Sequence, residues 1–435
     1  MSTTLRTRGP IRARLALLLT ALLLLAVPLP AAAQVTPEED PAEAAAGWLV
    51  SVLTDDPAVG TEFGPSAGPT IDVLFALAAV GVAGDELGSI ADWLTTQAPS
   101  YTQGAGFDAE DAAYAGASAK LALAMLVMDR DPRDVGGIDL IEQLSQLEVT
   151  DPEDGIVGRF SDRGEFDDFS TPLTQSLALL ALTRAPDVTP STEAVDVLVD
   201  QACPDGGFPS QFAPETCTSS VDTTGFAVQA LLAAGATDAA EAAADWLVEV
   251  QASDGSFSSP DGVNTNSTGV AAAALTATGQ DDAAEAARAW ITDQQDGCAT
   301  DSPGAIPFNR SERGSVELAT AQATFGLAGA GLATVTAEGA APEAPEVVCA
   351  QAEPQEPQEP EAPADDDTAE AEPEEPVDAP APSDDVPQPT GVDAGLSPSS
   401  TPDEVPGLVL AVALLGAALL LAGLAGSRRR RSVTR

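Results

Sequence analysis

The chain has 435 residues, a formal net charge of −50 and no histidine. This charge argues against nucleic acid and anionic surfaces as partners, because both would be repelled. The lack of histidine excludes a Ser-His-Asp triad, and an aromatic content of 4% leaves little for an aromatic cage.

Residues 1–33 have the layout of a secretory signal peptide. Arginines precede the apolar run Leu15–Val27, and small residues follow it up to Ala33. We expect cleavage after Ala33. A retained membrane helix is the alternative, but the run is short for a span and ends at Pro28.

Residues 42–335 contain a repeat, and a Trp-Leu-like pair marks each unit. The pairs are Trp48-Leu49, Trp93-Leu94, a degenerate Gln143-Leu144, Val197-Leu198, Trp246-Leu247 and Trp290-Ile291. They recur roughly every 50 residues, a spacing typical of repeat architectures. All four tryptophans of the chain occupy this one position.

Two further registers accompany the pair. A loop phenylalanine is expected in each unit, at Phe63, Phe107, Phe160, Phe208, Phe257 and Phe308. A threonine opens an apolar helix that ends near a glycine, at Thr70, Thr171, Thr224, Thr268 and Thr320. Each unit is therefore predicted to be a helix, a Gly-rich loop and a second helix.

The two helices of a unit differ in character. The first is amphipathic, as in residues 242–250, whereas the second is almost entirely Ala, Leu, Val and Gly and must be buried all round. This alternation predicts an all-α fold, an α6/α6 toroid with an outer ring around an inner ring. An open right-handed superhelix is the competing arrangement.

The four cysteines form an even set, which favours disulfides in an exported protein. We expect Cys203 to pair with Cys217 and Cys298 with Cys349. The sequence leaves the other two connectivities open.

The C-terminal part predicts a stalk and an anchor. Residues 341–405 are rich in Pro, Glu, Asp, Gln and Ala without Lys or Arg, which favours a disordered spacer over an acidic tail for a basic partner. Residues 407–427 are predicted to form one transmembrane helix. The basic tail 428–435 places the C-terminus in the cytoplasm, so the protein is expected in the cell membrane as a single-pass protein with its N-terminal domain extracellular.

A family resemblance follows from the loops. The segment Gln251 to Phe257 resembles the Gln-x-x-x-Gly-x-Trp repeat of squalene and hopene cyclases, with Phe257 in place of Trp. The helix beginning at Thr224 is similar to inner helices of the prenyltransferase and squalene oxidase repeat group. The resemblance implies an α6/α6 toroid, a fold shared by lyases, transferases and animal cobalamin carriers.

The activities of that group find little support in the residues. A zinc-dependent protein prenyltransferase needs a histidine ligand, which is absent, so no metal site is expected. A cyclase of the squalene type uses an Asp-x-Asp-Asp acid, of which only Asp222 has a counterpart. We expect Asp222 to cap its helix instead, as Asn266 does in the next unit.

Glycosidases also use α6/α6 rings, often with paired carboxylates. The candidate acids are Asp111, Asp167, Asp168, Asp222 and Glu317. In a chain this acidic such pairs arise by chance, and no further tryptophan is left for a sugar platform. No catalytic residue is assigned beyond Asp222 as a cyclase-like candidate.

Polar residues near the starts of the inner helices are the candidate ligand-binding residues. They are Thr171, Gln175, Asp222, Thr223, Thr224, Asn264, Asn266, Thr268 and Glu317. If these helix ends share one mouth of the ring, the site suits a neutral hydrogen-bonding ligand with an apolar body. The alternative is that each of these residues only caps a helix.

These observations favour a cell-surface domain that binds or scavenges a small ligand and has a transporter as partner. No cofactor is expected, and cobalamin is the candidate ligand that the resemblance implies. The alternatives are an exported enzyme of the cyclase or prenyltransferase type and a ligand-free adhesion or scaffold module.

Overall fold

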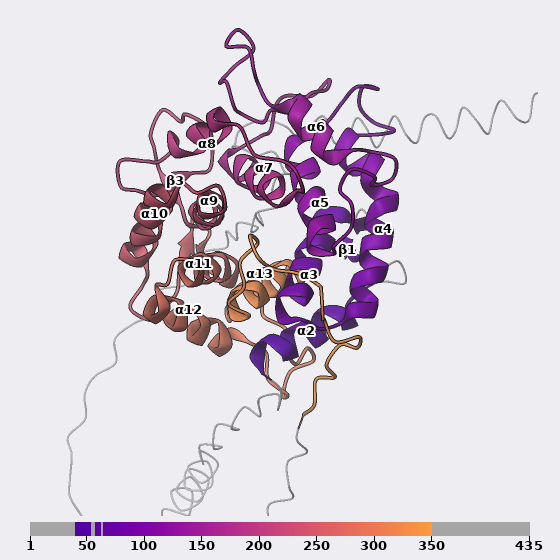
Figure 1. Cartoon of the computed structure of the whole chain (residues 1–435). Helices are drawn as coiled ribbons and strands as arrows, with labels where there is room; N and C mark the ends of the chain where they lie inside the picture. Colours follow the sequence, from indigo (N-terminus) through magenta and orange to yellow (C-terminus); the bar gives the residue numbers. More distant parts are fainter. Residues whose placement is uncertain (1–39, 54–56, 62–63, 350–435) are drawn as a thin grey trace, which may run out of the picture. The chain divides into compact units, whose positions relative to one another are not determined.

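The computed structural model describes residues 40–53, 57–61 and 64–349, which form a helical domain (Figure 1). Twelve helices and three short hairpins lie in these ranges. None of these helices combines the length and the hydrophobicity that crossing a bilayer requires. The predicted signal peptide, Phe63, residues 350–405 of the predicted stalk, the predicted transmembrane helix and the basic tail lie outside the described residues.

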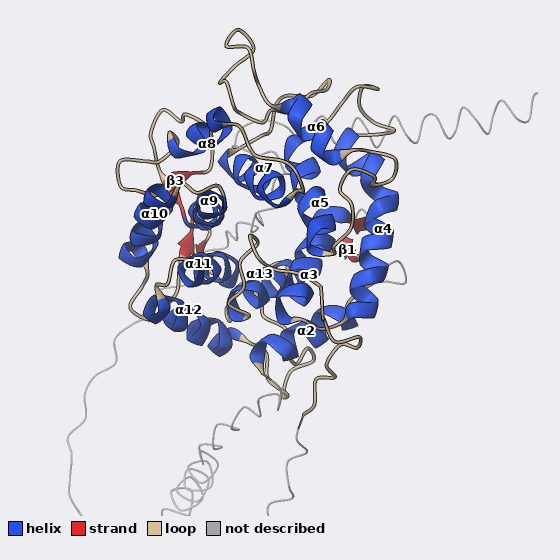
Figure 2. Cartoon of the chain, in the orientation of Figure 1, coloured by secondary structure: helices blue, strands red, loops and turns tan. Residues whose placement is uncertain are grey.

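The helices alternate between an inner and an outer ring (Figure 2). The inner helices are α3 (Ala67–Val80), α5 (Ala115–Val127), α7 (Pro172–Arg184), α9 (Val221–Ala233), α11 (Thr265–Ala277) and α13 (Val316–Leu327). The outer helices are α2 (Pro41–Ser51), α4 (Gly84–Gln103), α6 (Leu140–Leu147), α8 (Thr192–Val199), α10 (Thr237–Val250) and α12 (Asp281–Gln294). This alternation is the one that the repeat predicts.

Composition explains the two rings. The inner helix α9 is buried along its first three turns, from Val221 to Leu231, because its residues are apolar or small. The outer helix α10 buries only one stripe, which includes Trp246 and Leu247, and turns its acidic residues outward. The second residue of every Trp-Leu-like pair is at most 1% exposed, so this register anchors each outer helix to the inner ring.

The ring is closed. Each inner helix packs against the next, and α13 packs against α3 and α2. The side-chain amide of Gln295 donates to the carbonyl of Pro41 at 2.8 Å and to that of Gly304 at 3.0 Å, which joins the last unit to the first. The described domain is therefore a toroid and not an open superhelix.

Three antiparallel hairpins lead directly into inner helices. They are β1 (Val59–Thr61) with β2 (Gly64–Ser66), β3 (Phe208–Pro209) with β4 (Ser219–Ser220), and β5 (Ser258–Ser259) with β6 (Gly262–Val263). Their registers place Val59 opposite Ser66, Phe208 opposite Ser220 and Ser258 opposite Val263. The hairpins precede α3, α9 and α11 and bring the loops back over the starts of these helices.

A side-chain oxygen in the first turns of an inner helix holds the preceding loop. The hydroxyl of Thr224 accepts from the backbone N–H of Phe208 at 2.8 Å. The same bond joins Thr70 to Val59, Thr268 to Phe257 and Thr320 to Ile306, and the Gln175 amide oxygen accepts from Phe160. This bond satisfies a buried backbone N–H in each case.

Two parts of the predicted registers are wrong. Gln175, and not Thr171, holds the loop in the third unit, because Thr171 lies one turn earlier as the N-cap of α7. The loop phenylalanine is not universal. Phe107 is 62% exposed, and in the sixth unit Ile306 takes the place expected for Phe308.

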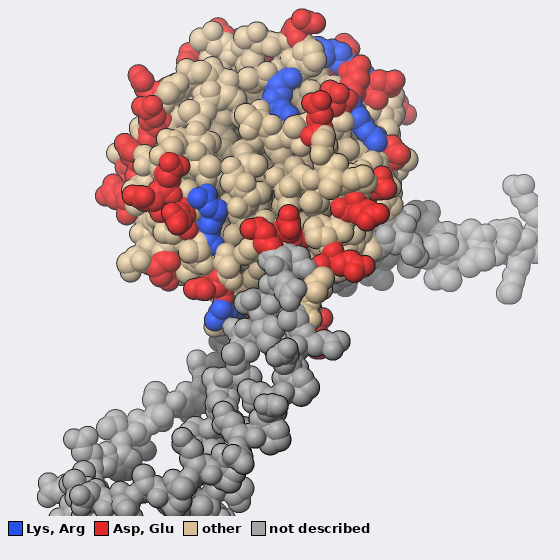
Figure 3. All heavy atoms as spheres, turned by 60° about the horizontal axis from the view of Figure 1, so that its bottom comes forward, with Lys and Arg blue, Asp and Glu red and all other residues tan. Residues whose placement is uncertain are grey.

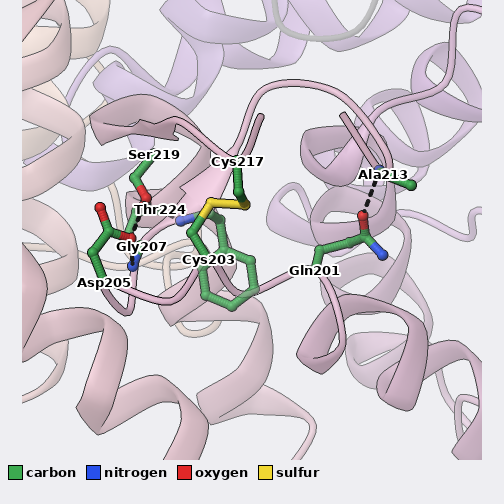
Figure 4. The surroundings of a disulfide bond; sticks show 9 residues. Gln201, Cys203, Asp205, Gly207, Ala213, Cys217, Ser219 and Thr224 are labelled. Atoms are coloured by element: carbon green, nitrogen blue, oxygen red, sulfur yellow. Dashed lines mark hydrogen bonds between the residues drawn. A yellow bond between two sulfur atoms is a disulfide. The ribbon is translucent and has the colours of Figure 1, made fainter. Parts of the chain in front are cut away.

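Both expected disulfides are present, Cys203 with Cys217 and Cys298 with Cys349. The first joins the two sides of the loop that carries β3 and β4 (Figure 4). Asp205 supports the same loop, since it accepts from the hydroxyl of Ser219 at 2.7 Å. The second ties the end of the described chain to the segment after α12.

Residues 328–349, here called the strap, continue past the expected boundary at 335. The strap bonds to the ends of three inner helices, because Arg184 donates to the carbonyls of Leu332 and Val335, and Val127 and Gly81 accept from later strap residues. Since these are C-terminal ends, they share one mouth of the ring, and the strap crosses it (Figure 1). The N-terminal ends of the inner helices define the other mouth.

Candidate functional site

Most of the predicted ligand-binding residues serve the scaffold. Thr224, Thr268 and Gln175 hold loops, and Gln175 also donates to the carbonyls of Gly158 and Ala194. Thr171 caps α7 in a capping box with Thr174. The hydrogen bonds of these side chains stabilise the fold.

The expected capping role of Asp222 and Asn266 is wrong. The N-caps are Ser220 for α9 and Asn264 for α11, which accept from the backbone N–H of Thr223 and Ser267. Both caps have extended backbone, whereas the predicted residues lie two positions further on, inside the helix. Asp222 and Asn266 are thus free of capping and occupy equivalent second positions of neighbouring inner helices.

One face of the inner helices keeps a small residual exposure, and we assign this face to the centre of the ring. Asp222, Asn266 and Gln322 are 7 to 8% exposed, while the loop-holding threonines are fully buried. Phe226 follows Asp222 by one helical turn and is 9% exposed, and Phe325 on α13 is 7% exposed. These five side chains, from α9, α11 and α13, are called the lumen cluster below.

Asn266 is the member of the lumen cluster that has an unsatisfied hydrogen-bonding atom. Its amide nitrogen donates to the Gln322 amide oxygen at 3.1 Å, which links α11 to α13. Its own Oδ1 atom is buried and has no hydrogen-bond partner. A buried acceptor without a donor is costly, so the position is one where a ligand can supply the missing bond.

Asp222 has a perturbed acidity. Burial raises the pKa of its carboxyl to about 6, against a hydrogen bond from Ser267 that lowers it, and Asp261 near the β5–β6 turn raises it further. The Ser267 bond also joins α9 to α11. A carboxyl with this pKa can give or take a proton near neutral pH.

Glycines let the three helices approach closely. A side chain at Gly269 would lie 2.3 Å from the carbonyl oxygen of Gln322, and one at Gly225 would lie 2.6 Å from Val270. Gly326 would in turn meet the Gly269 carbonyl at 2.5 Å. The absence of side chains at these positions lets α11 pack closely against α9 on one side and against α13 on the other.

A second polar contact lies between α3 and α5. Lys120, the only lysine of the chain, is 1% exposed, and its ammonium donates to the Asp72 carboxylate at 2.9 Å. The two residues lie on neighbouring inner helices, one turn below the starts of the helices. This ion pair compensates its own buried charges.

The remaining predicted residues are not members of the lumen cluster. Glu317 is partly exposed in the first turn of α13, and Leu318 takes the position that Asp222 and Asn266 occupy in their helices. Thr223 is buried beside Asp222. Of the paired acids considered for a glycosidase, Asp168 pairs with Arg159 at 2.7 Å outside the lumen cluster.

A surface pocket of about 450 Å³ lies at the strap side of the ring. It is lined by residues that follow α5 and α7, including Arg130, Arg133 and Asp187. Both arginines are already engaged, Arg130 with Asp92 and Arg133 with the Pro186 carbonyl. We place the candidate site at the lumen cluster instead, because the Oδ1 atom of Asn266 there is buried and lacks a hydrogen-bond partner.

Three of these residues escape sequence reasoning. Gln322, Asp72 and Lys120 are buried in apolar helices, and their contacts follow only once the helix phase is known. Lys120 carried a usable signal, since a single lysine within an Ala-rich buried helix requires a partner. Within residues 40–349 as described, no three His, Cys, Asp or Glu side chains are grouped to hold a metal ion.

Neither a protein-family model nor a curated protein matches the chain. Solved structures resemble it in fold. Protein geranylgeranyltransferase-I of Candida albicans is 13% identical with a TM-score of 0.42, over 59% of this chain and 83% of that one. A type II terpene cyclase from Scytonema, in complex with geranylgeranyl dihydroxybenzoate, is 16% identical with a TM-score of 0.46, over 66% and 95%.

The ent-copalyl diphosphate synthase from Streptomyces platensis is 20% identical with a TM-score of 0.42. The match covers 61% of this chain and 52% of that one, so the chain spans about half the length of the synthase. These are proteins of the α/α toroid type. The likeness concerns the fold and assigns no activity to this chain.

Proposed function

We propose that the toroid binds a small molecule at the lumen cluster, with the polar end of the ligand on Asn266 and its apolar body against Phe226 and Phe325. The observation that carries this proposal is the partnerless Oδ1 atom of Asn266. Of the predicted residues, the proposal gives the ligand contact to Asn266 and includes Asp222 as a member of the same cluster. It assigns Thr171, Gln175, Thr224, Asn264 and Thr268 to the scaffold.

The expected topology remains part of the proposal. A signal peptide, an acidic stalk and one membrane helix would hold the ring outside the cell, where it would deliver its ligand to a transporter. Protease treatment of intact cells tests this. Loss of the ring from intact cells supports the proposal, and protection of the ring until the cells are lysed contradicts it.

Binding is tested with the full-length chain and a panel of cobalamin, polyprenyl compounds and oligosaccharides, by calorimetry and thermal shift. We expect one class to bind and Asn266→Leu to weaken it at least tenfold. Gln146→Leu, an amide replacement on the exposed face of α6, is the matched control and should leave the affinity unchanged. Equal affinity of Asn266→Leu and the unaltered chain would refute the site.

An enzyme is the second candidate, and the raised pKa of Asp222 favours it. A buried carboxyl with a pKa of about 6 is suited to general acid catalysis. Product formation from a polyprenyl compound that Asp222→Asn abolishes would establish this activity. Binding without product supports the carrier, and silence from the whole panel favours the ligand-free scaffold.

A further inference from the structure

We propose that the ligand presents an ammonium group to the lumen cluster, and that Asp222 and Asn266 together receive it. This inference rests on the proposed function and names its ligand class. It departs from the neutral ligand that the sequence favours.

The free capacity of the two side chains is for accepting hydrogen bonds. Asn266 has committed its amide nitrogen to Gln322 and leaves its Oδ1 atom without a donor. Asp222 accepts one hydrogen bond from Ser267, and an ionised carboxylate can accept several. A ligand that bonds to the acceptor atoms of both side chains must therefore carry hydrogen-bond donors. An ammonium group has three, whereas a hydroxyl has one.

Within the described part of the protein, the carboxyl of Asp222 has no basic side chain among the influences on its pKa. Burial and a second acid, Asp261, raise this pKa, and the hydrogen bond from Ser267 lowers it. Asp72, by contrast, has Lys120 at 2.9 Å. A ligand cation would supply to Asp222 what Lys120 supplies to Asp72.

The wider field has the same sign. The chain carries a net charge of −50, and acidic side chains are spread over the face shown in Figure 3, with few basic ones among them. Such a field attracts cations and repels carboxylate or phosphate ligands. The positive ends of the helix dipoles at this mouth act against a cation, but their effect is weaker than direct pairing with a desolvated carboxylate.

The apolar part of the lumen cluster also accepts a cation. Phe226 lies one turn from Asp222 on the same face of α9, and Phe325 lies on α13. The faces of aromatic rings attract ammonium groups, most strongly where water is excluded. A compact amine with a hydrocarbon or aromatic body therefore matches the cluster.

The test compares three probes of similar size, benzylamine, benzyl alcohol and benzoate, on the full-length chain at pH 7.5. We expect benzylamine to bind at least tenfold more tightly than benzyl alcohol, and benzoate to show no binding. Asp222→Asn and Asn266→Leu should each reduce benzylamine affinity at least tenfold. Asp282→Asn removes the same charge from the exposed start of α12 and should leave the affinity unchanged.

The outcomes separate the inference from the proposed function. If benzyl alcohol binds more tightly than benzylamine and this binding is lost in Asn266→Leu, the ammonium inference is wrong and the proposed binding site stands. An equal loss of benzylamine binding in Asp282→Asn would show general attraction to an acidic surface and would overturn the inference. No binding of any probe, or of the wider panel, would overturn both. Circular dichroism confirms that each variant is folded before it is compared.

Discussion

Two buried carboxyls lie on the inner ring, and they differ in what surrounds them. Asp72 on α3 pairs with the ammonium of Lys120 on α5. Asp222 on α9 has a hydroxyl and a second acid as neighbours, and on the neighbouring helix α11 Asn266 has an acceptor without a donor. Between α3 and α5, the buried carboxylate is neutralised by a lysine of the same chain. Among the described residues of α9, α11 and α13, Asp222 has no such basic partner and Asn266 lacks a donor. We therefore assign the ligand to these three helices.

The largest effect on stability is expected when the ammonium partner of Asp72 is removed. Lys120→Met leaves the buried Asp72 without its cation and should lower the free energy of unfolding by about 3–5 kcal/mol. Urea unfolding at pH 7, followed by tryptophan fluorescence, measures the loss. Adding Asp72→Asn to the same chain should recover most of it, since no buried charge then remains. A loss below about 1 kcal/mol in the single variant would show that the pair is not sealed from solvent.

Replacing the carboxyl of Asp222 should have the opposite effect and raise the free energy of unfolding. Burial raises the folded-state pKa of Asp222 to about 6, so the stabilisation from its protonated form is complete below its ordinary pKa of 3.8 and is lost as the pH rises through 6. Asp222→Asn cannot ionise. It should match the unaltered chain near pH 4 and exceed it above pH 7 by at most about 3 kcal/mol.

Unfolding free energies of both chains from pH 4 to 8 give this comparison. Asp162, whose pKa burial also raises to about 6, is present in both and cancels in the difference. The exposed control Asp282→Asn should show no such trend. A difference between Asp222→Asn and the unaltered chain that does not change with pH would mean that Asp222 is not desolvated.

A smaller effect on stability is expected when the hydrogen bond from Ser267 to Asp222 is removed. Ser267→Ala removes the donor that lowers the pKa of Asp222, so the ionised carboxylate loses support. We expect a loss of about 1–2 kcal/mol at pH 8 and a smaller one at pH 4. In an Asp222→Asn background the pH dependence of this loss should vanish. A double-mutant cycle measures it, and an undiminished dependence would place the effect of Ser267 elsewhere.

The fold follows from the sequence because its signals are repeated. The Trp-Leu-like register marks the outer helices, and the Ala-rich segments mark the inner ones. Each recurs often enough that one degenerate copy, such as Gln143-Leu144, does not obscure the period. Local exceptions escape prediction, because hairpin and loop lengths differ between units. Phe107 is exposed, and Ile306 takes the place expected for Phe308.

The candidate site is only half predictable. Asp222 and Asn266 stand out as polar residues at helix starts, but the sequence does not distinguish a cap from a residue two positions further on. Their neighbours Gln322 and Phe325 depend on the phase of α13 around the ring. That phase is set by close packing at Gly269 and Gly326, which is a tertiary contact and leaves no local pattern.

The measurement that tests the account most directly is the titration of the Asp222 carboxyl itself. Carbon-13 labelling of aspartate, with Asp222→Asn to assign the resonance, follows its ionisation by NMR with and without benzylamine. We predict a midpoint near pH 6 in the free protein and a clear fall when the amine is bound, because a bound cation favours the carboxylate. A midpoint near the ordinary value of 3.8, or one that benzylamine does not move, would contradict the account.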